Sequence, residues 1–225
     1  MGRIGLLGGT FDPIHYGHLR AAEEAYEALA LQKVLFLPSP DPPHKRRPDL
    51  SPFGLRLEMV RLAVEGIPHF EPSDLEEKLP KPSYSVRTLT YLRKKSRDEI
   101  YFILGLDAFL ELETWYQYRE LPRLAHLVVV TRGEGGKEAF LRKLKELFPM
   151  VQEEGEVFRY PQGYTFRYLP MLRLDISSTY LRKLFREGRS GRFLLPEMVR
   201  RFVLEKALYQ GDGEDARGDC GKNPG

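Results

Sequence analysis

The sequence of 225 residues has little cysteine, no long apolar run and no large excess of charge of either sign. Its single cysteine, Cys220, excludes an intramolecular disulfide framework. No apolar run approaches the roughly 20 residues that cross a bilayer, and the first residues lack the apolar core of a signal peptide. The formal net charge of +3 is too small to indicate binding of nucleic acid. We therefore expect a soluble, cytoplasmic protein that binds neither membrane nor nucleic acid.

Size and composition favour one globular domain. Hydrophobic residues make up 42% of the chain and charged residues 30%, which is enough to build a core and to cover it. The last residues, 210–225, are polar and rich in glycine, and we expect them to be disordered. The sequence thus predicts a single domain over residues 1–209, with a helical C-terminal part over about 176–209.

Short apolar runs alternate with helical patterns along this domain. Buried strands are expected at 4–7, 33–37, 100–104, 127–131 and 166–169. Helices are expected at about 17–29, 53–66, 85–95, 139–147, 178–186 and 196–208. This alternation predicts an α/β fold, a Rossmann-like, doubly wound parallel sheet with helices on both faces. Ligands of such folds bind beyond the carboxyl ends of the strands, where the strand order reverses.

The first predicted strand runs into GGTFDPIHYGHL, residues 8–19, a segment suited to phosphate. Gly8 and Gly9 let a ligand approach the backbone closely. His15 and His18 flank Gly17, where a helix begins and free amides favour anions. A single histidine near glycines usually makes a structural hydrogen bond, but a pair beside Gly-Gly favours a phosphate site. Zinc binding would need a third ligand, which does not cluster here, so we expect no metal held by the protein.

Two later segments present further donors. In PPHK, His44 and Lys45 either contact a phosphate or belong to a solvated basic loop. Ser177 or Ser178 is a natural N-cap, and Arg182 follows about one turn inside the helix. This block is either a plain helix cap or a site for nucleotide phosphates. The basic residues that follow, up to residue 201, either form a solvated helical face or face phosphate.

Trp115 is the only tryptophan of the chain. A lone tryptophan usually packs in a core. Here it lies in the polar aromatic stretch ETWYQY, shortly after Gly105 and Asp107 at the end of a predicted strand. The alternative interpretation is that its indole stacks on a planar ring of a ligand.

Together these segments resemble the nucleotidylyltransferase superfamily, and within it the bacterial nicotinate-mononucleotide adenylyltransferases. GGTFDPIHYGHL, with its His-x-Gly-His element, and DISSTYLR at 175–182 resemble blocks shared across the superfamily. PPHK at 42–45, PSYSVRTL at 82–89 and GLDAFLELETWY at 105–116 resemble blocks that separate this family from its relatives. The blocks occur in the family's order from Gly8 to about Tyr209, nearly the whole predicted domain.

The resemblance implies that the phosphate of nicotinate mononucleotide attacks the α-phosphorus of ATP, with Mg²⁺ on the ATP phosphates. It implies that His15, His18, Lys45 and Arg182 act at the reacting phosphates. The implied ATP-binding residues are Gly8, Gly9, Thr10, Phe11, His15, His18, Gly105, Asp107, Ile176, Ser177, Ser178 and Arg182. Those implied for the mononucleotide are His44, Lys45, Ser85, Trp115 and Tyr116, with Trp115 stacked on the pyridine ring and the main-chain amides of Ser85 and Tyr116 on its carboxylate.

The sequence departs from the family pattern at two positions. Arg87 stands where the family usually carries an acidic residue, and Ser85 replaces a threonine. Three alternatives stay open: transfer to nicotinamide mononucleotide, another reaction of the superfamily such as transfer to phosphopantetheine or cholinephosphate, and a nucleotide-binding regulator without catalysis. Whether the chain forms a homo-oligomer is also left open.

Overall fold

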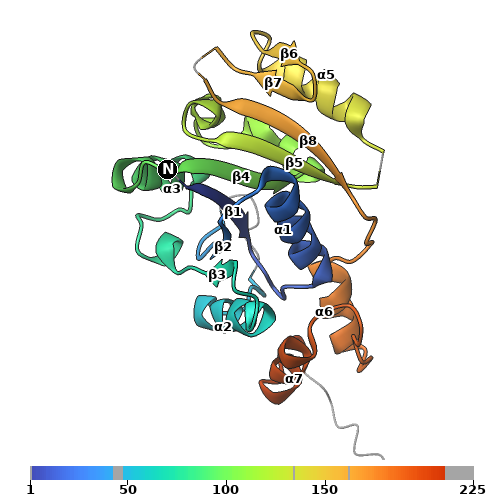
Figure 1. Cartoon of the computed structure of the whole chain (residues 1–225). Coiled ribbons are helices and arrows are strands. Elements are labelled where there is room, and N and C mark those ends of the chain that lie inside the picture. The colour runs from blue at the N-terminus through green and yellow to red at the C-terminus, as the bar shows by residue number, and fades with distance from the viewer. Residues whose placement is uncertain (1, 43–47, 134, 162, 211–225) are drawn as a thin grey trace, which may run out of the picture.

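The computed structural model describes residues 2–42, 48–133, 135–161 and 163–210, and the centre of this part is an eight-stranded sheet (Figure 1). Its strands lie in the order β3-β2-β1-β4-β5-β8-β7-β6. The first six of this order are parallel, whereas β7 and β6 are added antiparallel. The strands are β1 (Arg3–Gly9), β2 (Lys33–Pro38), β3 (Phe70–Pro72), β4 (Glu99–Gly105), β5 (His126–Arg132), β6 (Gln152–Glu154), β7 (Val157–Arg159) and β8 (Thr165–Met171).

All five predicted strands are present, and three that the sequence did not predict join them. Each of these three, β3, β6 and β7, has only 3 residues. A segment so short cannot display an alternating pattern, and all three residues of β6 are exposed. The predicted α/β fold with a doubly wound sheet is confirmed, and the antiparallel hairpin is an addition at one edge.

The predicted helices form within a few residues of their expected bounds. They are α1 (Tyr16–Leu29), α2 (Phe53–Val64), α3 (Ser85–Lys95), α5 (Lys137–Leu147), α6 (Ser178–Arg186) and α7 (Glu197–Glu205). The short helix α4 (Leu106–Leu110) and 3₁₀ turns at Leu75–Glu77, Leu112–Thr114 and Tyr118–Arg123 were not predicted. Helix α7 ends earlier than expected because Ala207 takes a left-handed φ of 48°, which stops a helix.

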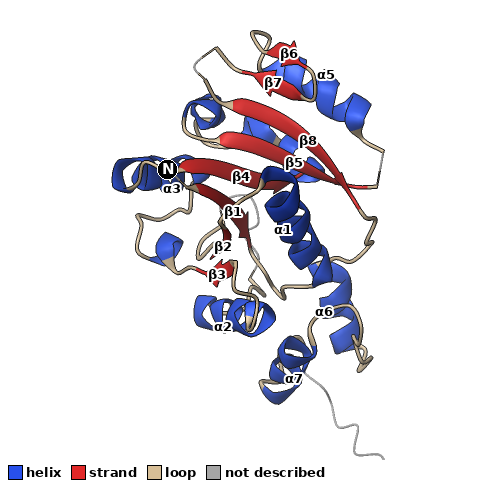
Figure 2. Ribbon diagram, viewed as in Figure 1, coloured by secondary structure: helices blue, strands red, loops and turns tan. Residues whose placement is uncertain are grey.

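Helices cover both faces of the sheet (Figure 2). Alternate residues of β5 point to opposite sides: Val128 and Val130 belong to one core, Leu127 and Val129 to the other. Helices α1, α2, α6 and α7 contribute to the first core, and α3, α4 and α5 to the second. Buried on both faces, the central strands read as continuous apolar runs, as the sequence indicated.

The register brings the loops that follow β1, β2 and β4 to one edge. Gly9 at the end of β1 lies beside Pro38 of β2, and Leu7 beside Ile103 of β4. From β1 the chain moves to β2 and β3 on one side, and later to β4, β5 and β8 on the other. The strand order therefore reverses at β1, and the N-terminal motif lies at the switch point, where ligands of this fold bind.

A buried arginine joins these loops. Arg56 of α2 is 1% exposed, and its Nε donates a hydrogen bond to the carbonyl of Ser51 over 2.8 Å. Its Nη1 donates to the carbonyls of Thr10 and Ser39, each over 2.8 Å. Thr10 follows β1, Ser39 follows β2 and Ser51 precedes α2. One guanidinium group thus connects three separate backbone segments at the carboxyl edge.

Two predictions about the ends of the chain are not tested. The extent of a single domain over residues 1–209 stays a prediction. The tail predicted to be disordered falls, from residue 211 onward, outside the described residues. Across the described ranges, no helix is both long and apolar enough to cross a membrane.

Replacing Arg56 with Met should lower the free energy of unfolding by about 3 kcal/mol, because three carbonyls, one in a buried and two in part-buried hydrogen bonds, lose a charged donor. Arg61→Met, on the same helix, is the matched control: its side chain is 56% exposed and pairs with Glu58 across one turn. That change should stay within about 0.5 kcal/mol. Urea unfolding followed by circular dichroism measures both; equal losses would show that the three hydrogen bonds contribute little.

Candidate functional site

The N-terminal loop, residues 10–15, connects β1 to α1 at the switch point. Phe11 is 1% exposed although it has a left-handed φ of 48°, and its ring packs back toward the end of β1. A Cβ atom on Gly9 would lie 3.1 Å from that ring, so a larger residue would press on the ring and glycine permits the close packing. Gly8 is exposed and Thr10 half-buried. The backbone beside the loop is therefore open to a ligand.

The two histidines stack on each other at the start of α1. Their ring centroids are 3.7 Å apart, with an angle of 27° between the planes. The amide of His15, the N-cap residue, donates to Nδ1 of His18 over 3.3 Å. Because Nδ1 accepts, the neutral ring of His18 carries its proton on Nε2, which can then donate to a ligand. A Cβ on Gly17 would come within 3.0 Å of the His15 ring, so glycine permits this arrangement.

The start of α6 packs against the same loop. Ser177 is the N-cap, and its Oγ accepts from the amide of Tyr180 over 3.2 Å. Ser178 donates through Oγ to the carbonyl of Pro13 over 2.9 Å. Ile176 is buried in the core between these elements. The cap is therefore confirmed, and the block also holds the N-terminal loop, whereas its contact with ATP stays a prediction.

Arg182 is 7% exposed and lies against the N-terminal loop. Its Nη1 donates to the carbonyl of Asp12 over 2.8 Å, and Nη2 donates to Oγ1 of Thr179 over 3.2 Å. The sequence predicted that this guanidinium would turn toward phosphate. In the described structure it binds the main chain of the loop that leads to the histidines. Arg182 therefore lies beside the histidine pair and holds this loop.

The residues predicted for the mononucleotide lie on two neighbouring segments. Ser85 begins α3, and the ring of Tyr84 before it stacks on Tyr116, with centroids 4.5 Å apart. Trp115 is half-buried and meets Phe102 edge to face at 6.3 Å. Tyr116 is 46% exposed. The structure thus brings these segments together, and the stacking of Trp115 on a ligand ring stays a prediction.

The nearby end of β4 carries the residues predicted for the ribose. Gly105 ends the strand and is the N-cap of α4, and Asp107 is exposed in the first turn of that helix. Both lie where β4 passes directly into α4, at the carboxyl edge. Their predicted contact with a ribose is compatible with this position and stays a prediction.

His44 and Lys45, predicted at the phosphates, lie outside the described residues. The described chain before them is anchored to the start of α3. The amide of Asp41 donates to Oγ of Ser83 over 3.3 Å, and the amide of Ser83 donates to the carbonyl of Asp41 over 3.2 Å. The loop after β2 therefore runs beside the segment that carries Ser85.

Arg87, the departure from the family pattern, has a structural position. Its guanidinium lies 4.8 Å from the centroid of the Tyr84 ring. Its Nη1 also lies within 3.3 to 3.4 Å of the carbonyls of residues 80–82. The cation therefore holds the turn before α3 and packs on the aromatic pair.

Three residues of the site were not predicted. Arg56 falls on the apolar face of its helix, at the spacing of Met59, Val60 and Ala63, and that position was the available signal. Asp12 is 0% exposed, and its Oδ1 accepts from the hydroxyl of Tyr209 over 2.6 Å. No local sequence pattern predicts this hydrogen bond, because it joins residues 197 positions apart.

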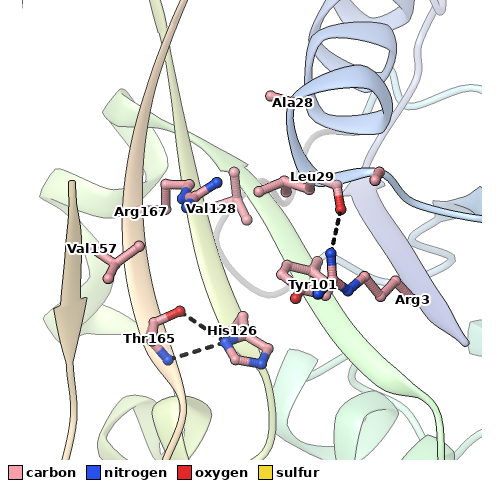
Figure 3. A pocket seen from close by; sticks show the side chains of 10 residues that line it. Arg3, Ala28, Leu29, Tyr101, His126, Val128, Val157, Thr165 and Arg167 are labelled. Carbon is pink, nitrogen blue, oxygen red and sulfur yellow. Dashed lines mark hydrogen bonds between the residues drawn. The ribbon is translucent and has the colours of Figure 1, made fainter. Parts of the chain in front are cut away.

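A cavity of about 210 Å³ lies at the opposite, amino edge of the sheet (Figure 3). Tyr101, His126 and Thr165, all near the starts of strands, line it together with the end of α1. Arg3 donates there to the carbonyl of Leu29 over 3.3 Å, which places a cation at the negative end of the helix. Burial lowers the pKa of His126. None of the predicted site residues lines this cavity.

Within the ranges that the structure describes, no cluster of three or more His, Cys, Asp or Glu side chains could hold a metal ion.

The fold and the loop at its switch point define a class of nucleotide-binding α/β proteins, and comparison with known families makes that class specific. Residues 6–184 match the family model described as cytidylyltransferase-like. This span starts in β1 and includes both the N-terminal loop and Arg182.

Individual relatives identify the family within this class. A protein of Trichlorobacter lovleyi named "probable nicotinate-nucleotide adenylyltransferase" is 44% identical over 211 residues, covering 92% of this chain and 99% of its own. One of Geobacter metallireducens with the same name is 40% identical, covering 93% and 99%. The chain belongs to the nicotinate-nucleotide adenylyltransferase family. The fold also matches the nicotinic acid mononucleotide adenylyltransferase of Plasmodium falciparum complexed with NaAD, with a TM-score of 0.72 at 17% identity, covering 93% and 98% of the two chains.

A buried carboxyl group lies against α3, the helix that Ser85 begins. Glu76 is 8% exposed, and Oγ1 of Thr88 in α3 donates to its Oε1 over 2.9 Å. Burial raises the pKa of Glu76 to about 7, and the hydrogen bond from Thr88 opposes the increase only in part. The folded protein therefore keeps this carboxyl protonated at pH values where the unfolded chain has lost the proton.

This difference makes stability depend on pH. Above about pH 4.5 the unfolded chain binds fewer protons than the folded one, so the free energy of unfolding should fall until about pH 7, by roughly 3 kcal/mol. Glu76→Gln, which stays neutral, should lose most of this decline. Urea unfolding of both proteins at several pH values between 5 and 7.5 measures it. An equal decline in the variant would assign the effect to other groups.

Proposed function

We propose that the protein transfers the adenylyl group of ATP to nicotinate mononucleotide, which forms nicotinate adenine dinucleotide and releases pyrophosphate. The observation that carries the proposal is the stacked pair His15–His18 at the start of α1, held at the switch point of the sheet. The names of relatives at 44% and 40% identity over nearly the whole chain support the same reaction. The Plasmodium falciparum protein of similar fold binds NaAD, the product of this reaction.

The chemistry is a displacement at the α-phosphorus of ATP. An oxygen of the mononucleotide 5′-phosphate forms the new bond to this phosphorus, and the bond from phosphorus to the bridging oxygen of the β-phosphate breaks. Pyrophosphate leaves with that electron pair. The attacking phosphate is already an anion, so the protein needs no covalent nucleophile. Its tasks are to position two anions and to stabilise the charge that develops between them.

The histidines fit this task. Nε2–H of His18 is the donor that we assign to the α-phosphate, because its Nδ1 is occupied by the amide of His15. His15 stacks on that ring and keeps its orientation. We also assign Lys45 and Arg182 to the reacting phosphates. Arg182 is held near them by its hydrogen bond to the carbonyl of Asp12.

The remaining assignments follow the edge of the sheet. We assign Gly8, Gly9, Thr10 and Phe11 to the ATP phosphates, together with the start of α6 at residues 176–178. Gly105 and Asp107 are assigned to a ribose, whose hydroxyls can donate hydrogen bonds to a carboxylate. His44, Ser85, Trp115 and Tyr116 are assigned to the mononucleotide. The exposed ring of Tyr116 and the half-buried indole of Trp115 offer aromatic surface beside the helix that Ser85 begins.

We propose that Mg²⁺ enters the site bound to the phosphates of ATP. The described residues offer no acidic cluster for a cation, and Asp12 already accepts from Tyr209. The ATP phosphates and water are then the ligands of the ion, as is common for Mg²⁺.

Purified protein should release pyrophosphate from ATP when nicotinate mononucleotide is added. Nicotinamide mononucleotide tests the nearest alternative, and phosphopantetheine tests a different reaction of the superfamily. A coupled pyrophosphate assay compares the three acceptors at equal concentration. Faster release with phosphopantetheine would overturn the assigned acceptor, and binding of ATP without any release would favour a regulator.

Replacing His18 with Ala should lower kcat about 100- to 1000-fold, the usual loss when one donor at a developing charge is removed. His69→Ala is the control, because His69 also stacks on an aromatic ring, that of Tyr26 at 3.8 Å, but lies before β3 at the amino edge. It should keep kcat within about twofold. The pyrophosphate assay measures both variants. A His18 variant with the turnover of the control would remove the histidine from the proposed centre.

A further inference from the structure

Tyr209 lies near the end of the described chain and contacts the N-terminal loop. The hydroxyl donates a hydrogen bond of 2.6 Å to Oδ1 of Asp12, whose side chain is fully buried in the N-terminal loop. This contact joins the turn after α7 to the loop that leads into His15 and His18. The assignments of the proposed function give neither Tyr209 nor Asp12 a role.

The turn after α7 carries Tyr209 inward. The helix ends with a hydrogen bond of 2.9 Å from the amide of Leu208 to the carbonyl of Val203, around Ala207 in the left-handed region. Tyr209 itself has a left-handed φ of 64°. This conformation costs free energy for a residue with a bulky side chain, so the contacts of the side chain must hold it.

Those contacts come from three elements. The ring of Tyr209 stacks on Phe185 of α6, with centroids 6.2 Å apart, and its hydroxyl lies 3.9 Å from Sδ of Met59 in α2. Burial raises the pKa of Tyr209, and the charge of Asp12 raises it further. The hydroxyl is therefore protonated in the neutral range and remains a donor to the carboxylate.

The same short piece of loop is also held by α6. Arg182 donates to the carbonyl of Asp12, and Ser178 donates to the carbonyl of Pro13. Tyr209 supplies the bond to the side chain of Asp12. Three donors from the C-terminal part thus fix two consecutive residues, and His15 follows directly after Ile14.

We propose that Tyr209 is a positioning residue for the nucleotidyl transfer: by holding the Asp12 carboxylate it fixes the N-terminal loop and so the orientation of the His15–His18 pair. For its kinetic consequence the inference rests on the proposed function. Its structural consequence can be measured without any substrate.

The structural test compares the histidine rings in two variants by NMR. Tyr209→Phe removes only the hydroxyl and leaves the ring on Phe185. The matched control is Tyr101→Phe, which removes a hydroxyl bonded to Glu99 at the amino edge, where the ring of Tyr101 stacks on His126 at 4.6 Å. Tyr209→Phe should shift the imidazole resonances of His15 and His18 and leave that of His126 in place. Tyr101→Phe should do the reverse.

The kinetic test uses the same variants. Tyr209→Phe should lower kcat about tenfold while the KM for ATP changes less than about twofold, because the loss concerns the orientation of donors rather than the affinity of the ground state. Tyr101→Phe should leave both values unchanged. If the hydroxyl acts through Asp12, Tyr209→Phe combined with Asp12→Asn should lose no more than the more affected single variant.

Unchanged resonances of His15 and His18 in Tyr209→Phe would overturn the proposal, and so would a kcat equal to that of the control. If the unmodified protein releases no pyrophosphate with any mononucleotide, the proposed function fails. The resonances then still decide whether Tyr209 orients the histidines.

Discussion

The carboxyl edge of the sheet depends on the buried guanidinium of Arg56. Three backbone segments that are separate in sequence end at this group, which donates to the carbonyls of Thr10, Ser39 and Ser51. These charge-assisted hydrogen bonds hold the loops after β1 and β2 in place at the edge where anionic substrates are proposed to meet.

Arg182 of α6 makes a similar contact with the same loop. It too is buried and donates to main chain, the carbonyl of Asp12. In the proposed site, some residues hold the backbone and others are assigned to the ligand. Arginines suit the first task, since a planar group with five donors can bind several carbonyls at once. A histidine such as His18 suits the second, since the backbone can fix one ring nitrogen and leave the other to donate to a ligand.

Much of this architecture was predictable from the sequence, and the failures have two causes. Local patterns predicted the five long strands, and the cap at Ser177 placed α6 at its observed bounds. The strands β3, β6 and β7 were missed because three residues display no period. The glycines and histidines of the N-terminal motif indicated phosphate because their chemistry is concentrated in one segment. Arg56 and Tyr209 were missed because their partners lie 46 and 197 residues away in sequence.

The contact between Tyr209 and Asp12 has a consequence for how the protein is made. A chain leaves the ribosome from its N-terminus, and folding of its first part begins before the last part has appeared. The eight strands of the described residues end by Met171, and the match to the family model ends at residue 184. A nascent chain can therefore complete its sheet while the N-terminal loop still lacks the hydroxyl of Tyr209. The loop can reach its final hydrogen bonding only when the turn after α7 has folded.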